Sequence, residues 1–157
     1  MRAPVMHLLV ALVWLFLNGS ATLGSFLLGL AAGFILLAVF QRALRCESYI
    51  RRIRFFCSFV VRLLREIILS NFRITQLILS KNASQLTGRF ADYDVSDLTD
   101  IEILIMAQCL SLTPGTTVAE HNDQGQLVLH TFPALADEDL KAIVDKTVKQ
   151  PMLAFTR

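Results

Sequence analysis

The first quarter of the chain carries almost no charge. Residues 3–41 contain no Lys, Arg, Asp or Glu, and a polar break at residues 18–22 divides them into two apolar runs. One bilayer crossing needs about 20 apolar residues, and a backbone in lipid must satisfy its own hydrogen bonds, which favours helices. The sequence therefore predicts a membrane α-helical hairpin. Its helices, at about 3–17 and 22–40, are slightly short for a bilayer core of about 30 Å.

A cleaved signal peptide is the alternative interpretation of the first run. Arg2 would form a minimal basic region, residues 5–17 the apolar core, and residues 19–21 a small-residue cleavage site. The second run would then anchor the mature chain. No further processing motif accompanies these residues, and the basic cluster that begins at Arg42 orients an uncleaved hairpin equally well.

Charge divides the chain into two halves. Residues 1–81 carry ten Lys or Arg against two Glu, whereas residues 82–157 carry five Lys or Arg against eleven Asp or Glu. The positive-inside rule places the arginines from Arg42 onward in the cytoplasm. We therefore expect a transmembrane hairpin at 1–46, an arginine-studded helix at 47–81 and an acidic cytoplasmic domain at 82–157. The acidic half argues against nucleic acid as a partner.

Small residues recur on one face of the second apolar run. The predicted helix-packing residues, at four-residue spacing, are Ser25, Gly29 and Gly33. Small side chains let another helix approach closely, although glycine is also common in membrane helices generally. His7 is the only titratable side chain within the two runs, and ion paths through membranes normally use such groups. The chain alone is therefore a poor candidate for a pore or a pump.

Residues 47–80 are apolar but regularly interrupted. Polar side chains recur at three-, four- and seven-residue steps, which places them on one face of a helix. The charged stripe expected at a membrane interface comprises Arg51, Arg54, Arg62, Arg65, Glu66 and Arg73. Two placements remain open: an amphipathic interfacial helix on the cytoplasmic leaflet, or a third transmembrane helix in which Glu66 pairs with Arg62.

After a polar connector at 81–84, the patterns predict a small α+β domain in the order β-α-β-β-α. We expect a strand at 91–95, a helix from 97 to about 110, paired strands at 117–121 and 126–132, and a helix at 136–149. Ser96 and Asp97 are the expected helix cap. The expected buried face of that helix comprises Leu98, Ile101, Ile105 and Cys109.

The string Thr113-Pro114-Gly115 predicts a structural turn after this helix. Pro114 cannot continue a helix, and Gly115 permits a left-handed backbone. Residues 122–125 are turn formers between the two later strands and predict a β-hairpin.

The sequence offers little catalytic chemistry. Cys46, Cys57 and Cys109 are odd in number and lack C-x-x-C spacing, so neither a disulfide framework nor a zinc site is expected. If His121 pairs with Gln126, His130 lies about 13 Å away along the hairpin, too far to share a metal ion. We find no nucleophile triad, phosphate loop or pocketed carboxylate pair. The sequence therefore predicts neither an enzyme nor a cofactor site.

Residues 107–118 contain the string Ser111-Leu112-Thr113-Pro114-Gly115-Thr116, and a strand with Leu127-Val128-Leu129-His130 follows. In this context the chain resembles the E-type subunit of the Mrp-type (Mnh, Pha) multisubunit monovalent cation/proton antiporters. The resemblance extends to the apolar N-terminal pair with its Gly-Ser turn, the G-x-x-x-G of the second run, and the arginine-studded third run ending at residues 77–80. It covers nearly the whole chain, and one departure from the pattern is the turn at 121–125.

The resemblance implies an accessory subunit of a multisubunit Na⁺(K⁺)/H⁺ antiporter in the bacterial cell membrane. Its implied partners are the other hydrophobic subunits and the lipid bilayer, and the large subunits are implied to carry the ion path. No catalytic residue or cofactor is carried over. Two other functions remain open from the sequence: a self-sufficient membrane-tethered binding module that recruits a soluble partner, and an enzyme with a membrane anchor.

Overall fold

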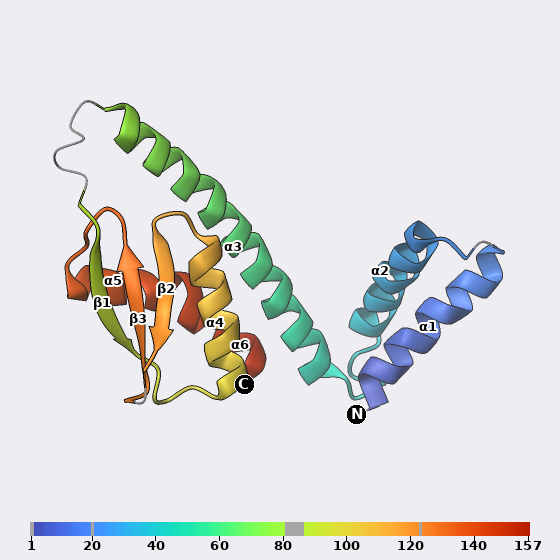
Figure 1. The fold of residues 1–157 in the computed structure, drawn as a ribbon. Coiled ribbons are helices and arrows are strands. Elements are labelled where there is room, and N and C mark those ends of the chain that lie inside the picture. Colours follow the sequence, from blue (N-terminus) through green and yellow to red (C-terminus); the bar gives the residue numbers. More distant parts are fainter. Residues whose placement is uncertain (1, 20, 81–86, 123) are drawn as a thin grey trace. The chain divides into compact units, whose positions relative to one another are not determined.

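A computed structural model of the chain describes residues 2–19, 21–80, 87–122 and 124–157. The chain forms two compact units, residues 1–54 (unit 1) and residues 55–157 (unit 2) (Figure 1). Its helices are α1 (Arg2–Asn18), α2 (Leu23–Val39), α3 (Glu47–Leu79), α4 (Asp100–Leu112), α5 (Asp137–Val144) and α6 (Gln150–Thr156). Its strands are β1 (Arg89–Asp94), β2 (Thr116–His121) and β3 (Gln126–Thr131). The predicted connector at 81–84 lies outside the described residues, as do Ser20 and Asp123 of the predicted turns.

Unit 1 consists of α1, α2 and the first turns of α3. Gly19 adopts a positive φ of 62°, which lets the chain reverse after α1. Thr22 then caps α2, because its hydroxyl accepts a hydrogen bond of 3.2 Å from the Ser25 backbone N–H. The start of α3 packs against α2 through a small core of Leu37, Cys46 and Ile50.

The predicted membrane hairpin is wrong as a description of the fold. Among the described residues, no helix combines the length and the apolar character that a membrane crossing requires. α1 and α2 have 17 residues each, roughly 25 Å of helix against a hydrocarbon core of about 30 Å. α3 has 33 residues, but charged side chains recur along it. Of the two placements left open for this helix, the third transmembrane helix is therefore wrong as well.

Unit 2 is built on an antiparallel sheet of three strands in the order β1-β3-β2. Tyr93 of β1 pairs with Leu127 of β3, and a bulge interrupts the β2–β3 ladder between Val118 and Glu120. From β1 to α5 the element order is the predicted β-α-β-β-α, because alternation and turn residues are local signals. The observed architecture is thus helical with one small three-stranded sheet.

Helix α4 begins later than predicted, and a different face of it is buried. Its cap is Thr99, not Ser96 or Asp97, because residues 95–98 form a separate turn closed by a bond from the Leu98 N–H to the Val95 carbonyl. The prediction that Ile101 is buried is wrong, since Ile101 is 70% exposed. The buried residues of α4 are Glu102, Met106, Cys109 and Leu110.

The last helical segment extends beyond the predicted end at residue 149. A π-helical segment at Asp145–Lys149 links α5 to α6, and the Gln150 N–H bonds to the Asp145 carbonyl. Pro151 follows in the first turn of α6 and has no N–H to donate to the preceding turn. The change from α-helical to π-helical hydrogen bonding before Pro151 therefore loses no hydrogen bond at the proline. The chain stays helical to Thr156.

The core of unit 2 lies between one face of the sheet and the helices. The sheet contributes Tyr93, Leu127 and Leu129, and the helices contribute Met106, Leu140, Met152 and, from α3, Phe59. Phe155 of α6 lies 5.2 Å from the Phe59 ring, centroid to centroid, which joins α6 to α3. The opposite face of the sheet is open, with Phe90 exposed.

Candidate interaction surfaces

The predicted helix-packing residues lie buried on one face of α2: Ser25, Gly29 and Gly33. In the structure α1 of the same chain covers this face. The Asn18 amide donates a hydrogen bond of 2.6 Å to the Ser25 hydroxyl. A Cβ on Gly29 would lie 3.0 Å from the Ala11 carbonyl oxygen, and one on Gly33 would lie 2.9 Å from Cδ2 of His7. The small residues therefore let the two helices approach closely.

We expect Gly29→Ala to destabilise unit 1 by about 1 kcal/mol, because the new methyl group meets the backbone of α1 and the loss exceeds the gain in helix propensity. Gly24→Ala is the matched control, since a Cβ there meets no atom within 4 Å. Trp14 is the single tryptophan of the chain and borders Gly29, so its fluorescence during thermal unfolding reports on this unit. Equal midpoints for the two variants would contradict the close approach.

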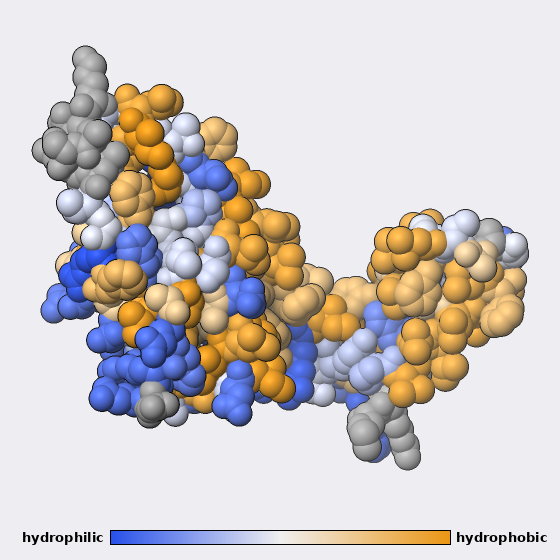
Figure 2. Space-filling view, in the orientation of Figure 1, coloured by the Kyte–Doolittle hydropathy of each residue, from blue (hydrophilic) through white to orange (hydrophobic). Residues whose placement is uncertain are grey.

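The outward surface of the α1–α2 pair is broadly apolar (Figure 2). Its large exposed side chains include Val5, Leu9, Val13, Phe16, Leu17, Leu23, Leu27, Leu28, Ile35 and Val39. Phe16 is 85% exposed and Leu17 82%. Contiguous apolar surface of this kind on a folded protein marks a site of contact with another protein or with lipid.

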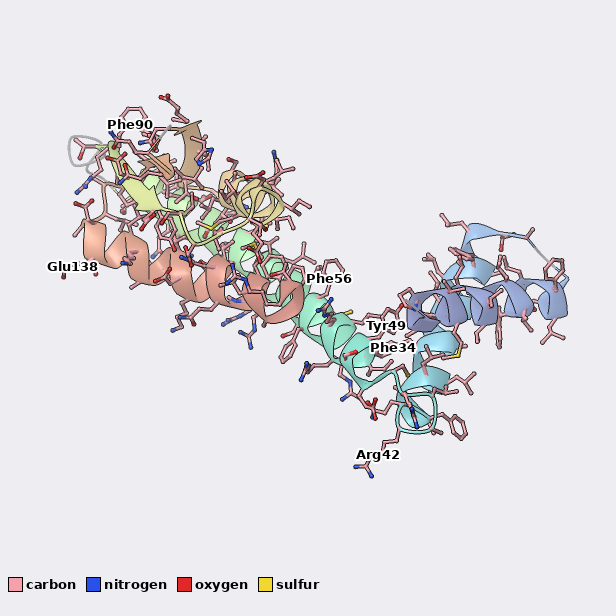
Figure 3. The ribbon with its side chains drawn as sticks, turned by 90° about the horizontal axis from the view of Figure 1, so that it is seen from below. Phe34, Arg42, Tyr49, Phe56, Phe90 and Glu138 are labelled. Atoms are coloured by element: carbon pink, nitrogen blue, oxygen red, sulfur yellow. The ribbon has the colours of Figure 1, made fainter. Side chains whose placement is uncertain are left out.

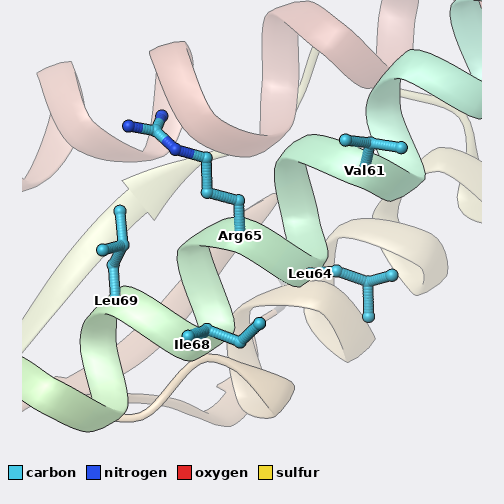
Figure 4. A pocket seen from close by; sticks show the side chains of 5 residues that line it. All are labelled: Val61, Leu64, Arg65, Ile68 and Leu69. Atoms are coloured by element: carbon cyan, nitrogen blue, oxygen red, sulfur yellow. The ribbon is translucent and has the colours of Figure 1, made fainter.

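Helix α3 carries a second apolar surface, here called the α3 stripe and defined as Cys57, Val61, Leu64, Ile68 and Phe72. These residues recur at helical spacing, and all are exposed because the opposite side of α3 packs on the core of unit 2. A shallow hollow along the stripe is lined by Val61, Leu64, Arg65, Ile68 and Leu69 (Figure 4). Because all five lining residues belong to one helix, the hollow is open surface and not an enclosed ligand pocket.

The predicted charged stripe runs along α3, and its five arginines, Arg51, Arg54, Arg62, Arg65 and Arg73, are exposed. Glu66 is half-buried and forms an ion pair with Arg73, not with Arg62 as the sequence suggested. The buried Ser70 hydroxyl links the pair, donating to Glu66 at 3.3 Å and accepting from Arg73 at 2.8 Å. The spacing of the charged residues in the sequence did not predict that Ser70 bridges this ion pair.

The predicted turn at Thr113-Pro114-Gly115 closes α4 and starts β2. The Thr113 hydroxyl donates a bond of 2.9 Å to the Cys109 carbonyl, and its N–H bonds to the Leu110 carbonyl at 3.1 Å. Gly115 has φ of 97°, and its carbonyl accepts a bond of 2.8 Å from the Phe132 N–H. The turn therefore ties the end of α4 to the end of β3.

Sequence reasoning missed a buried carboxylate at Glu102. One of its oxygens accepts from the Thr99 N–H at 2.9 Å, and the other accepts from the Thr156 hydroxyl at 2.7 Å. Arg157 completes an ion pair at 3.1 Å. The Arg157 guanidinium, the Thr99 N–H and the Thr156 hydroxyl lower the pKa of Glu102 to about 2. The available signal was Thr99-x-x-Glu102, which is a capping-box spacing.

No metal site emerges from the described residues, where no three His, Cys, Asp or Glu side chains gather closely enough to hold an ion. In the β2–β3 ladder His121 pairs with Leu127, one residue later than the sequence suggested, and His130 pairs with Thr117. The geometry thus presents surfaces for contact with apolar partners and no assembled reaction centre among these residues.

The family model and the similar known proteins agree on one family. A family model described as "Na+/H+ ion antiporter subunit" matches residues 7–154. The chain is 28% identical over 151 residues to the E1-type subunit of the Na⁺/H⁺ antiporter of Staphylococcus epidermidis, covering 93% of this chain and 94% of that one. It is 27% identical over 154 residues to the E-type subunit of the Na⁺/H⁺ antiporter of Alkalihalophilus pseudofirmus, covering 98% and 97%.

A solved structure shares the fold. It is a chain of the membrane-bound sulfane sulfur reductase, an archaeal respiratory membrane complex, with a TM-score of 0.55 and 16% identity, over 98% of this chain and 99% of that one. At this identity the likeness concerns the fold alone. The family match spans both units and includes the turn at 113–115. The chain therefore belongs to the Na⁺/H⁺ ion antiporter subunit family, as an E-type subunit of the Mrp kind.

Proposed function

We propose that this chain is an accessory subunit of a multisubunit Na⁺(K⁺)/H⁺ antiporter, supporting assembly and activity without carrying the ion path. The observation that carries the proposal is the exposed apolar surface of α1 and α2. Burying an aliphatic or aromatic side chain of this size contributes about 1.5 to 3 kcal/mol, so exposing ten of them to water is strongly unfavourable. Hydrophobic subunits and lipid are the partners whose chemistry covers such a surface.

The ion path is assigned to other subunits on chemical grounds. Proton and cation paths are lined by titratable or ion-ligating groups. In the described parts of α1 and α2, His7 is the titratable side chain that is buried, and both of its ring nitrogens are engaged by Tyr49 and the Leu30 carbonyl. We propose no catalytic step for this chain, because it belongs to a family of antiporter subunits.

We place the chain at the bacterial cell membrane, with unit 2 on the cytoplasmic side. The segment that joins the apolar pair to unit 2 carries Arg42, Arg45, Arg51, Arg52 and Arg54. The cytoplasmic leaflet is negatively charged and attracts basic segments by about 1 kcal/mol per Lys or Arg near its surface. The exposed arginines of the charged stripe extend the same attraction along α3.

The deciding experiment is purification of C-terminally tagged chain from native membranes in mild detergent, followed by mass spectrometry. We expect several large hydrophobic antiporter subunits to co-purify. Recovery of the chain alone, or with one soluble protein, would instead support the alternative of a self-sufficient tethered binding module.

We further expect the α3 stripe to be covered by lipid or a hydrophobic partner in the native membrane. Cys57 is part of the stripe and is exposed in the isolated chain, so it is a built-in probe. A charged, water-soluble maleimide should label Cys57 about tenfold more slowly in native membranes than in the purified chain, as expected if burial stabilises each covered side chain by about 1.5 kcal/mol or more.

The control for this labelling is Gln124→Cys, at the exposed end of the β2–β3 hairpin, which should react equally in both samples. Equal labelling of Cys57 in membranes and in detergent would show that nothing covers the stripe. The pull-down and the labelling thus test membership of the complex and the position of α3 separately.

A further inference from the structure

His7 lies where the three helices of unit 1 meet. It is 9% exposed, and its Nε2 lies 2.8 Å from the Leu30 carbonyl oxygen of α2, while its Nδ1 lies 2.8 Å from the Tyr49 hydroxyl of α3. A carbonyl oxygen only accepts, so Nε2 carries the hydrogen. In the neutral ring Nδ1 is then an acceptor, and Tyr49 must donate to it.

The contact fastens the first turn of α3 to the α1–α2 pair. Tyr49 also meets the His7 ring edge-on, with 5.8 Å between centroids. Figure 3 shows Tyr49 directed toward the pair and Arg42 directed away from it. Cys46 and Ile50, on either side of Tyr49 in the sequence, are buried at 2% and 1% exposure. Release of Tyr49 would therefore open the core that shields Cys46.

We propose that His7 forms a pH-sensitive contact. The neutral ring holds the start of α3 against α1 and α2, and protonation of the ring weakens that attachment. A second proton must bind Nδ1, the atom to which Tyr49 donates. Nδ1 then becomes a donor, so the Tyr49 hydroxyl can only accept from it. The hydrogen of that hydroxyl is left without its acceptor, and a positive charge is created in an apolar junction.

Among the described residues, the hydrogen-bond partners of the ring are the Leu30 carbonyl and the Tyr49 hydroxyl, and neither carries a negative charge. α2 contributes no ionisable side chain, and Tyr49 is the ionisable group that contacts the ring from α3. Burial raises the pKa of Tyr49 above its ordinary value, so its hydroxyl stays protonated. The other charged groups among the described side chains of unit 1 are Glu47 and the five arginines between 42 and 54, so positive charge dominates.

Cys46 alkylation in native membranes tests the proposal with the full chain in its complex. Histidine changes charge between about pH 5 and pH 8, so labelling is measured across that range and Cys46 peptides are quantified by mass spectrometry. The comparison variant is His7→Asn, whose amide oxygen accepts from Tyr49 but does not titrate. Dividing the Cys46 rate by that of the variant at each pH removes the intrinsic pH dependence of the thiol.

We expect this ratio to rise about fivefold from pH 8 to pH 5, the effect of about 1 kcal/mol from leaving the Tyr49 hydroxyl donor without an acceptor. Tyr49→Phe keeps the ring and removes the donor, so Cys46 should be labelled fast in this variant. The ratio of its Cys46 labelling rate to that of His7→Asn should not change with pH. A ratio that stays constant with pH would overturn the proposal, as would an equal rise in Tyr49→Phe. Cys109, buried in unit 2, should show no such dependence and reports any general unfolding.

Discussion

Replacing Gly115 with alanine is expected to destabilise unit 2 by about 3 kcal/mol, the sum of a left-handed backbone penalty and overpacking. Gly115 has φ of 97°, and an added Cβ would lie 2.6 Å from the Phe132 carbonyl oxygen and 3.3 Å from Cδ1 of Ile74. The Phe132 oxygen belongs to the backbone and cannot move without displacing the end of β3. Hydrogen–deuterium exchange of the β2 and β3 peptides in the full chain measures the loss.

Gly125→Ala separates the two contributions. Gly125 also has a positive φ, of 74°, but a Cβ there would meet its nearest atom, Cβ of Ser96, only at 3.6 Å. This variant should lose only the backbone term, about 1 kcal/mol. If Gly115→Ala were no worse than Gly125→Ala, the close packing of the 113–115 turn against β3 would be refuted.

Glu102→Ala should destabilise the junction of α4 and α6 by about 3 kcal/mol at neutral pH. The carboxylate is buried, closes the capping box with Thr99 and accepts bonds from Thr156 and Arg157. Removing it leaves the Thr99 N–H and the Thr156 hydroxyl without their acceptor. Faster amide exchange in residues 100–112 and 150–156 is the expected result, and unchanged exchange there would show that the buried pair is dispensable.

The same carboxylate gives unit 2 a defined acid sensitivity. Because folding lowers the pKa of Glu102 from its ordinary 4.5 to about 2, its contribution is fully present above pH 4.5 and is lost as the pH falls toward 2. Glu102→Gln, which keeps the shape and removes the charge, should therefore differ most from the unchanged chain near neutral pH. The two stability curves should converge below pH 4.5, and a constant difference across that range would exclude this linkage.

Local patterns predicted much of unit 2 correctly. Alternation around Tyr93 located β1, and Pro114 and Gly115 located the end of α4, because strands, caps and turns depend on neighbouring residues. The same patterns misplaced the buried face of α4. Ile101 is apolar but exposed, whereas Glu102 is charged but buried, because its partners Thr156 and Arg157 come from the other end of unit 2.

The uncharged run from 3 to 41 determined that this chain begins with two short apolar helices joined by a polar turn, since charge and helix length are properties of the sequence. It did not determine a membrane-crossing hairpin, because each helix ends at 17 residues. Only the tertiary structure showed that the face of Ser25, Gly29 and Gly33 is covered by α1, and that His7 contacts both Leu30 and Tyr49. Periodicity shows which residues share a face, but the partner of that face is decided by contacts between residues far apart in the sequence.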